Sequence, residues 1–104
     1  MPYVTDFQGR TIRLTEERWQ HISEHPEMTG MRDAVETTLR SPEVVVQSLI
    51  GERTQLYYRY YHRTMVGGKY VCVVVVTGRD DAFVVTAYLT DRIKKGDILW
   101  RKEP

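Results

Sequence analysis

Cysteine, net charge and long apolar runs are all scarce in this sequence. Its 104 residues include one cysteine, Cys72, which excludes a disulfide framework or a cysteine-rich zinc cluster within the chain. The formal net charge of +1 gives no overall basic field for extensive nucleic-acid binding, although it permits a short local contact. No apolar run reaches the length of a membrane span, and the first residues lack the pattern of a signal peptide. We therefore expect a cytoplasmic protein with no membrane partner.

The chain has the length and composition of one globular domain, which we expect to cover residues 1–104. A hydrophobic fraction of 41% and a charged fraction of 28% are enough for a single buried core without disulfides. The rest of the chain is organised around residues 69–91. There, an apolar, β-branched run at 70–77 predicts a strand that is covered on both faces, and Cys72 within it is expected to be buried. A turn at 78–81 leads into a second strand at 82–90.

The earlier part of the chain predicts a short hairpin and two helices. Strand-like runs at 3–7 and 10–14 flank a turn at Gln8-Gly9. A first helix follows the N-cap Thr15 and runs to about residue 24, because residue 25 precedes Pro26. A second helix covers 31–40, and strands follow at 44–49 and 54–63. A short turn at 92–95 stops at Gly96 and leaves an apolar tail, 98–100, docked on the sheet.

These elements predict an α+β domain. Its N-terminal helices pack on one face of a four-stranded antiparallel meander sheet, and a short hairpin precedes them. In the last meander strand, strict alternation divides the side chains between two faces. One face carries Phe83, Val85, Ala87 and Leu89, and the other carries Val84, Thr86, Tyr88 and Thr90. The stripe with Thr86 and Tyr88 is either a place for chemistry or a half-solvated face of good strand formers.

Two histidines in the first helical segment are candidates for acid–base chemistry. His21 and His25 are four residues apart, a spacing that places side chains on one side of a helix, at the border between core and solvent. Histidine titrates near neutral pH, which suits proton transfer. The alternative is an ordinary pair of surface histidines. A zinc site completed by His62 is a weaker alternative, because the sequence has no metalloprotease glutamate and no cysteine pair.

The strand at 54–63 is dense in tyrosine and arginine. Alternation places Arg59 on one face with Tyr57 and Tyr61, and places Tyr58 and Tyr60 on the other. Arginine between aromatic side chains can hold phosphate while the rings stack on bases. The same pattern can also be a cross-strand ladder that covers a sheet face.

A family resemblance is carried by five stretches: ERWQHISEHPEM, SPEVVVQS, YYRYY, KYVCVVVV and VVTAYLTD. Their order, over about residues 10–100, resembles the phage-associated nuclease branch of the barnase–EndoU–colicin–RelE (BECR) superfamily. The resemblance implies a BECR/RelE-like fold and a small ribonuclease that uses no metal or other cofactor. It further implies deployment as a toxin in conflicts among phages, bacteria and mobile elements. The implied partners are RNA, including tRNA, and an immunity or antitoxin protein.

Position by position, the resemblance places catalytic residues at His21, His25, Arg59, Thr86 and Tyr88. In the implied reaction, one histidine takes the proton of the RNA 2′-OH, which attacks the neighbouring phosphate and leaves a 2′,3′-cyclic phosphate. Arg59 and Thr86 would stabilise the developing charge, and Tyr88 or the other histidine would protonate the leaving oxygen. This chemistry predicts that all five side chains border one cleft. The low net charge argues against ribosome binding, and the alternatives are an inactive nucleic-acid- or protein-binding module and a structural or regulatory protein without a site.

Overall fold

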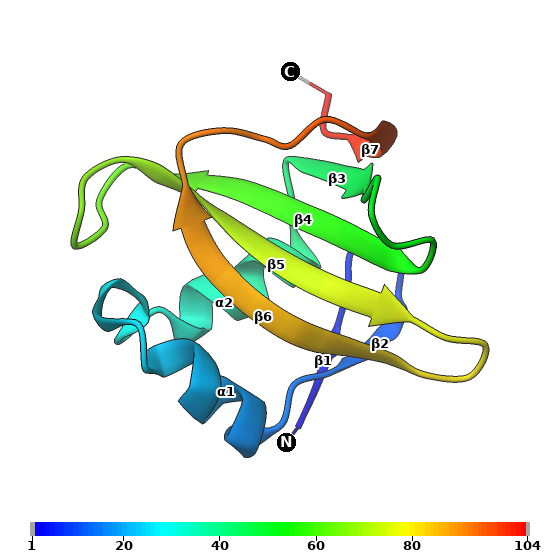
Figure 1. The fold of residues 1–104 in the computed structure, drawn as a ribbon, viewed down its shortest axis with the longest axis horizontal. Helices are drawn as coiled ribbons and strands as arrows, with labels where there is room; N and C mark the ends of the chain where they lie inside the picture. The colour runs from blue at the N-terminus through cyan, green and yellow to red at the C-terminus, as the bar shows by residue number, and fades with distance from the viewer. Residues whose placement is uncertain (1, 104) are drawn as a thin grey trace.

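Two helices cover one face of a seven-stranded mixed sheet in the computed structural model, which describes residues 2–103 (Figure 1). The sheet has the strand order β1-β2-β6-β5-β4-β3-β7. Its elements along the chain are β1 (Tyr3–Thr5), β2 (Thr11–Arg13), α1 (Glu16–Ser23), the 3₁₀ turn η1 (Pro26–Met28), α2 (Arg32–Arg40), β3 (Val44–Gln47), β4 (Thr54–Tyr61), β5 (Lys69–Thr77), β6 (Ala82–Thr90) and β7 (Asp97–Arg101). The α+β class predicted from the sequence is therefore confirmed.

The middle of the sheet is an antiparallel meander of β3, β4, β5 and β6. Its register places Tyr58 of β4 beside Cys72 of β5, and Cys72 beside Tyr88 of β6. Three polarisable side chains therefore lie in one row across the sheet, on the same face. This row lies on the face that the helices leave uncovered.

The sheet is larger than the predicted four strands because both ends of the chain extend it. The N-terminal hairpin joins at β6, where Arg13 of β2 pairs in parallel with Phe83. At the other edge, β7 pairs with β3, so the predicted apolar tail is a strand and not a docked segment. Residues 92–95 form no helical turn. Gly96 lets the chain pass close to β3, since a side chain there would collide with the carbonyl oxygen of Gln47.

Helix α1 begins and ends where local chemistry predicts. The Thr15 side chain accepts a hydrogen bond from the Arg18 backbone N–H at 3.1 Å, as an N-cap does. The helix ends at Ser23, and His25 has extended backbone angles (φ −79°, ψ 117°) because Pro26 disfavours helical geometry in the residue before it. His25 is therefore outside the helix, and the expected i, i+4 histidine pair on one helical side does not form.

The main core lies between the helices and the sheet. Ile22 of α1, and Val35 and Leu39 of α2, are buried against the strands. Helix α1 packs on β6, while α2 packs on β5 and β4. The largest buried side chain contributed by the sheet to this core is Tyr57. None of the helices within residues 2–103 has the length and apolar character needed to cross a membrane.

A β-bulge in β6 changes which side chains face the helices. Val74 pairs with Thr86, but the next residue of β5 pairs with Val84, so Val85 is the extra residue. Val84 is consequently buried in the helix-side core, together with Ala87 further along the strand. The strict alternation predicted from the sequence, which placed Val84 with Thr86 and Tyr88, is wrong at this point. An extra residue reverses the facing of everything before it.

The sheet face opposite the helices, which we call the open face, has a small apolar layer of its own. Its buried side chains are Val44, Val46, Leu56, Tyr58 and Cys72, with Tyr70, Val74 and Tyr88 packed around them. The chain between β6 and β7 crosses this layer, where the Lys94 backbone N–H donates to the Tyr58 hydroxyl at 3.0 Å.

Candidate functional site

A cleft with a volume of about 640 Å³ opens on the open face, between the β3–β4 loop and the segment that joins β6 to β7. Its floor is the sheet itself, where Leu56 of β4 and Val74 of β5 are neighbours. The remaining lining groups are of three kinds: apolar loop side chains, hydroxyls and amines. They include Leu49, Ile50, Thr86, Tyr88, Lys94 and Lys95. The site is therefore an apolar slot with cations on one side.

Thr86 and Tyr88 are the two predicted site residues that line this cleft. The Tyr88 hydroxyl is buried and has no hydrogen-bond partner among the described residues. Burial is the main cause that raises the pKa of Tyr88, and the neighbouring Cys72 thiol raises it further. At neutral pH Tyr88 is therefore a protonated phenol, whose hydroxyl can donate a hydrogen bond.

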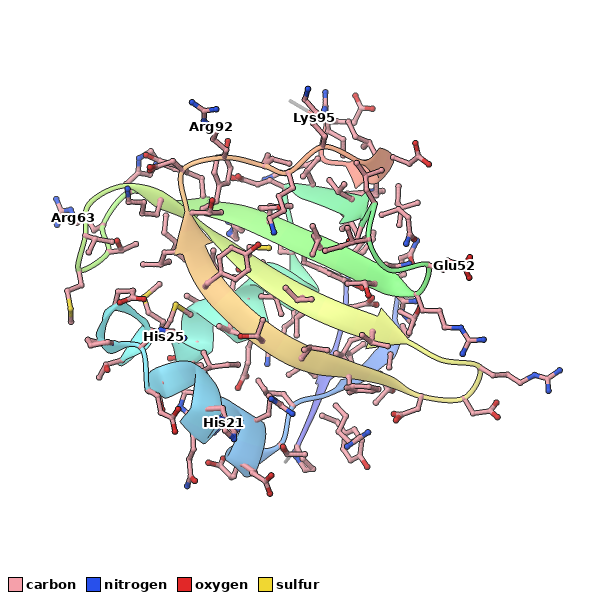
Figure 2. The ribbon with its side chains drawn as sticks, in the orientation of Figure 1. His21, His25, Glu52, Arg63, Arg92 and Lys95 are labelled. Atoms are coloured by element: carbon pink, nitrogen blue, oxygen red, sulfur yellow. The ribbon has the colours of Figure 1, made fainter. Side chains whose placement is uncertain are left out.

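Two consecutive lysines supply the positive charge of the cleft. Lys94 and Lys95 both line it, and the Lys94 ammonium lies 5.7 Å from the centroid of the Tyr88 ring. Figure 2 shows Lys95 and Arg92 on the same connecting segment, directed away from the body of the sheet. All three of these cations are exposed. An anion that entered the cleft would meet ammonium groups at its edge.

The opposite wall contains two apolar side chains that the fold leaves in solvent. Leu49 is 74% exposed and Ile50 is 94% exposed, so neither contributes to the core. Both lie in the loop after β3, beside the cleft. Apolar side chains that project next to a cavity are typical of surfaces that bind a partner or ligand.

A row of aromatic rings runs along the open face beyond the cleft. The rings pack edge to face. Their centroids are 6.2 Å apart for Tyr58 and Tyr70, 5.1 Å for Tyr70 and Tyr60, and 5.0 Å for Tyr60 and His62. We call these four side chains the aromatic row. Tyr60 and His62 are exposed, and Tyr70 is half-buried. Cross-strand contact between tyrosines, which is one part of the ladder left as an alternative by the sequence, is therefore present on this face.

The histidines of the first helical segment lie in the helical layer, on the opposite side of the sheet from the cleft. His21 is on α1 and His25 is just beyond it, on the helical side of the molecule (Figure 2). Their side chains are 60% and 67% exposed. Each lies close to a glutamate. The distance from Nδ1 of His21 to Oε1 of Glu24 is 3.8 Å, and that from Nδ1 of His25 to Oε1 of Glu27 is 3.9 Å. Acidic neighbours repel phosphate, so this surface does not favour RNA.

Arg59 is occupied in a structural contact. Its side chain shares the helix-side face with Tyr57 and Tyr61, and its Nη1 donates to the Ser41 carbonyl at 2.6 Å. Ser41 is the C-cap of α2, where carbonyl groups lack helical partners and attract a cation. Arg59 therefore ties the end of α2 to β4.

The five predicted site residues do not form one cleft. Thr86 and Tyr88 lie on the open face, whereas the Arg59 side chain is on the helix-side face of the sheet and His21 and His25 are in the helical layer. The geometric prediction that a helix histidine and Arg59 would meet Thr86 is wrong. The side of the sheet that the helices cover decides this, and it does not follow from local spacing. A group of three or more His, Cys, Asp or Glu side chains suited to a metal ion is also not assembled within residues 2–103.

Sequence reasoning missed the roles of Leu49, Ile50, Lys94 and Lys95 in the cleft. We expected Leu49 to end the strand at 44–49, and the two lysines fall in the turn expected at 92–95, to which we assigned no binding role. One signal was available. A pair of large aliphatic residues directly before Gly51 is unusual in a turn, where polar residues and glycine prevail.

Comparison with known proteins adds no identity, since no family model, no curated protein and no solved structure matches this chain. Membership of the BECR superfamily therefore stays a prediction from the five sequence stretches given above.

Proposed function

We propose that this domain is a metal-independent endoribonuclease that binds RNA across the open face of its sheet. One observation carries the proposal: Lys94 and Lys95 meet the hydroxyl side chains Thr86 and Tyr88 in a cleft of about 640 Å³. Ammonium groups bind phosphate oxygens, and hydroxyls can orient or protonate them. The cleft thus has the groups that a phosphodiester substrate requires.

The aromatic row supports RNA as the partner. Single-stranded nucleic acids bind to surfaces that combine cations along the backbone with aromatic rings on which bases stack. The open face has both features, with Tyr60 and Tyr70 on the strands, His62 just after β4, and lysines on the connecting segment. The net charge of +1 does not reveal these cations on the open face, because acidic residues of the helical layer offset them in the total.

Cleavage would follow the reaction that the BECR resemblance implies. RNA supplies its own nucleophile, the 2′-OH, which attacks the adjacent phosphorus, so that the 5′-oxygen leaves and a 2′,3′-cyclic phosphate forms. The titratable side chains within the cleft are Lys94, Lys95 and Tyr88. Solvent water would take the proton of the attacking 2′-OH, and the lysines would stabilise the charge on the phosphate. Tyr88, as a protonated phenol, would give its proton to the leaving 5′-oxygen and regain one from water. A toxin role, with an antitoxin partner, belongs to the same proposal.

A second candidate is an RNA-binding domain without catalysis. The observation that favours it is the separation of His21 and His25 from the cleft by the sheet. Without an imidazole beside the bound phosphate, the open face would bind RNA and leave it intact.

A fluorescent single-stranded RNA, incubated with the protein in EDTA, tests the proposal. Anisotropy measures binding, and denaturing gels measure cleavage. We expect Lys94→Ala/Lys95→Ala to weaken binding and to reduce the slope of log affinity against log salt by about 0.7 for each phosphate that the variant no longer binds. Arg18→Ala, which removes a cation from α1, is the matched control and should bind as the wild type does.

The cleavage assay separates the two candidates. For a ribonuclease using the cleft, Tyr88→Phe loses turnover and His25→Ala keeps it. Binding without cleavage by the wild type supports the second candidate, and the absence of any RNA binding contradicts both. Turnover that falls with His25→Ala but not with Tyr88→Phe would move the site to the helical layer.

A further inference from the structure

We propose that the cleft on the open face holds one unpaired nucleotide, so that the domain selects single-stranded or looped RNA over duplex RNA. This inference rests on the proposed RNA binding and adds the form of RNA that the site accepts. The base would lie in the apolar slot, and its phosphate would lie at the lysines.

The shape of the cleft fits an inserted base. Its volume of about 640 Å³ is within the range of about 300–1,000 Å³ that small-molecule sites have. The floor is formed by Leu56 and Val74, and the β3–β4 loop adds Leu49 and Ile50 at the side. A planar base buries both faces in such a slot, whereas a flat sheet could cover only one.

The exposed apolar side chains support the same occupant. Ile50 is 94% exposed and Leu49 is 74% exposed, so the fold gains nothing from keeping them apolar. A base between them and the floor would remove them from water, which stabilises the complex through apolar burial. Binding of a base would therefore explain why the β3–β4 loop has aliphatic residues at positions 49 and 50, which the stability of the fold does not explain.

Charge complementarity distinguishes a nucleotide from a purely apolar ligand. The Lys94 ammonium lies 5.7 Å from the Tyr88 ring centroid, so a cation is already placed at the mouth of the apolar slot. Lys95 adjoins it in the chain and also lines the cleft. A nucleotide combines a planar base with a phosphate anion joined to it through the sugar, which is the arrangement of this site.

Duplex RNA cannot offer the same contact. Its bases are paired and stacked inside an A-form helix, and its wide minor groove presents 2′-hydroxyls and base edges. To fill the cleft, a duplex would have to release a base at the cost of pairing and stacking. The lysines could still contact its phosphates, so the duplex should bind weakly rather than not at all.

The test compares binding of a single strand and a duplex of equal length, both 2′-O-methylated so that cleavage cannot occur. We expect the wild type to prefer the single strand by about 10- to 100-fold, the range that stacking of one base contributes. Ile50→Ser should weaken single-strand binding by about fivefold to tenfold and leave duplex binding unchanged. The matched control is Tyr3→Ser, an exposed aromatic residue on β1 at the far edge of the sheet.

Because Ile50 lies in solvent, its replacement tests the cleft without disturbing the core. Equal affinity for both RNA forms, or unchanged single-strand binding by Ile50→Ser, would overturn the inference while RNA binding itself stood. A wild type that binds neither form would remove the proposed function and, with it, this inference.

Discussion

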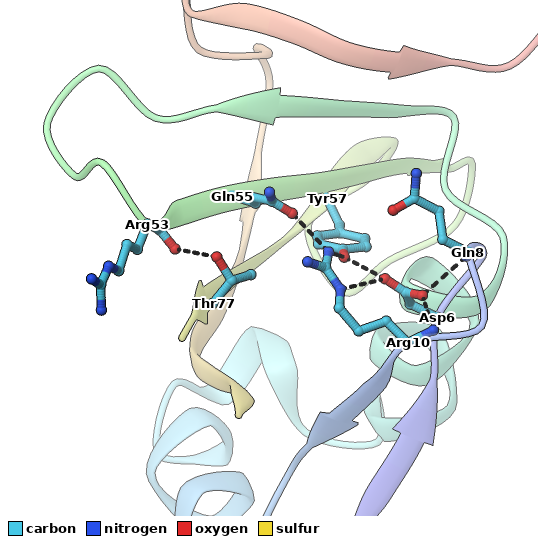
Figure 3. A network of polar contacts seen from close by, with 7 residues as sticks. All are labelled: Asp6, Gln8, Arg10, Arg53, Gln55, Tyr57 and Thr77. Carbon is cyan, nitrogen blue, oxygen red and sulfur yellow. Dashed lines mark hydrogen bonds and ion pairs between the residues drawn. The ribbon is translucent and has the colours of Figure 1, made fainter. Parts of the chain in front are cut away.

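The Tyr57 hydroxyl donates a hydrogen bond of 2.7 Å to Oδ2 of Asp6, which joins the middle of the sheet to the turn of the N-terminal hairpin (Figure 3). Asp6 is a buried carboxylate, and its Oδ1 accepts from the backbone N–H groups of Gln8 and Arg10 at 3.0 and 2.8 Å. The Arg10 Nε lies 3.4 Å from Oδ2. Every oxygen of the buried charge is thus satisfied, as burial requires.

Replacing Tyr57 with phenylalanine should therefore lower the free energy of unfolding. The ring is kept in the core, but Asp6 loses a hydrogen bond to a charged group, which contributes about 1.5–3 kcal/mol. Urea denaturation measures the change. The matched control is Tyr61→Phe, whose hydroxyl donates at 3.1 Å to the neutral Ala34 carbonyl and should cost about 0.5–1.5 kcal/mol. A Tyr57→Phe effect no larger than the control would show that the buried carboxylate does not depend on this bond.

Tyr88→Phe should have the opposite effect on stability and raise the free energy of unfolding. The Tyr88 hydroxyl is buried without a partner in the part of the chain that the structure describes, so removing it relieves a desolvation cost of about 1–3 kcal/mol. We expect the thermal midpoint to rise, in contrast to Tyr58→Phe, which removes the acceptor of the Lys94 N–H. Differential scanning calorimetry of both variants checks the pair. A lower midpoint for Tyr88→Phe would indicate that this hydroxyl has a partner in solution.

The buried tyrosines predict a loss of stability at alkaline pH. Burial raises the pKa of Tyr57 and of Tyr58 above the value of about 10 that tyrosine has in an unfolded chain. Their stabilising contribution is fully present below about pH 10 and declines above it, because the unfolded state releases its phenolic protons first. Each tyrosine lowers the free energy of unfolding by up to about 1.4 kcal/mol per pH unit in that window.

Urea titrations between about pH 9 and about pH 11 measure this decline. In Tyr57→Phe the free energy of unfolding should fall less steeply with pH than in the wild type, because one of the titrating groups is absent. Parallel curves for the two proteins would mean that other groups, such as the lysines, dominate the alkaline transition.

Cys72 should resist thiol reagents in the native protein. It is buried beneath the open face, and burial is the main cause that raises its pKa, so the reactive thiolate is disfavoured. We expect slow labelling by a disulfide reagent at neutral pH and rapid labelling in guanidinium chloride. Fast, complete labelling of the native protein would show that the segment with Lys94 and Lys95 opens readily over the sheet.

Much of the fold could be predicted because its signals are local. Thr15 caps a helix, Pro26 sets its end, and the apolar run of β5 predicts a central strand, each through neighbouring atoms or short-range periodicity. The strand β7 was misjudged as a docked tail. Its residues are apolar in either case, and only pairing with β3, about fifty residues earlier in the chain, makes them a strand.

The candidate site was harder to predict than the fold. Thr86 and Tyr88 were found, because a polar stripe beside an apolar strand is visible in the sequence. Their predicted companions were not, since His21, His25 and Arg59 lie across the sheet. The actual companions, Lys94 and Ile50, come from connecting segments whose paths depend on the finished sheet.

The sequence by itself determined the helices, their ends, the order of the meander strands and the burial of the central one, because propensity and alternation act over a few residues. Only the tertiary structure decided which layer each polar side chain joined. The helices cover only the face that carries Tyr57 and Ala87, and the bulge at Val85 turns Val84 toward the same core. The choice of the covered face placed the hydroxyls of Thr86 and Tyr88 with the lysines and away from the histidines.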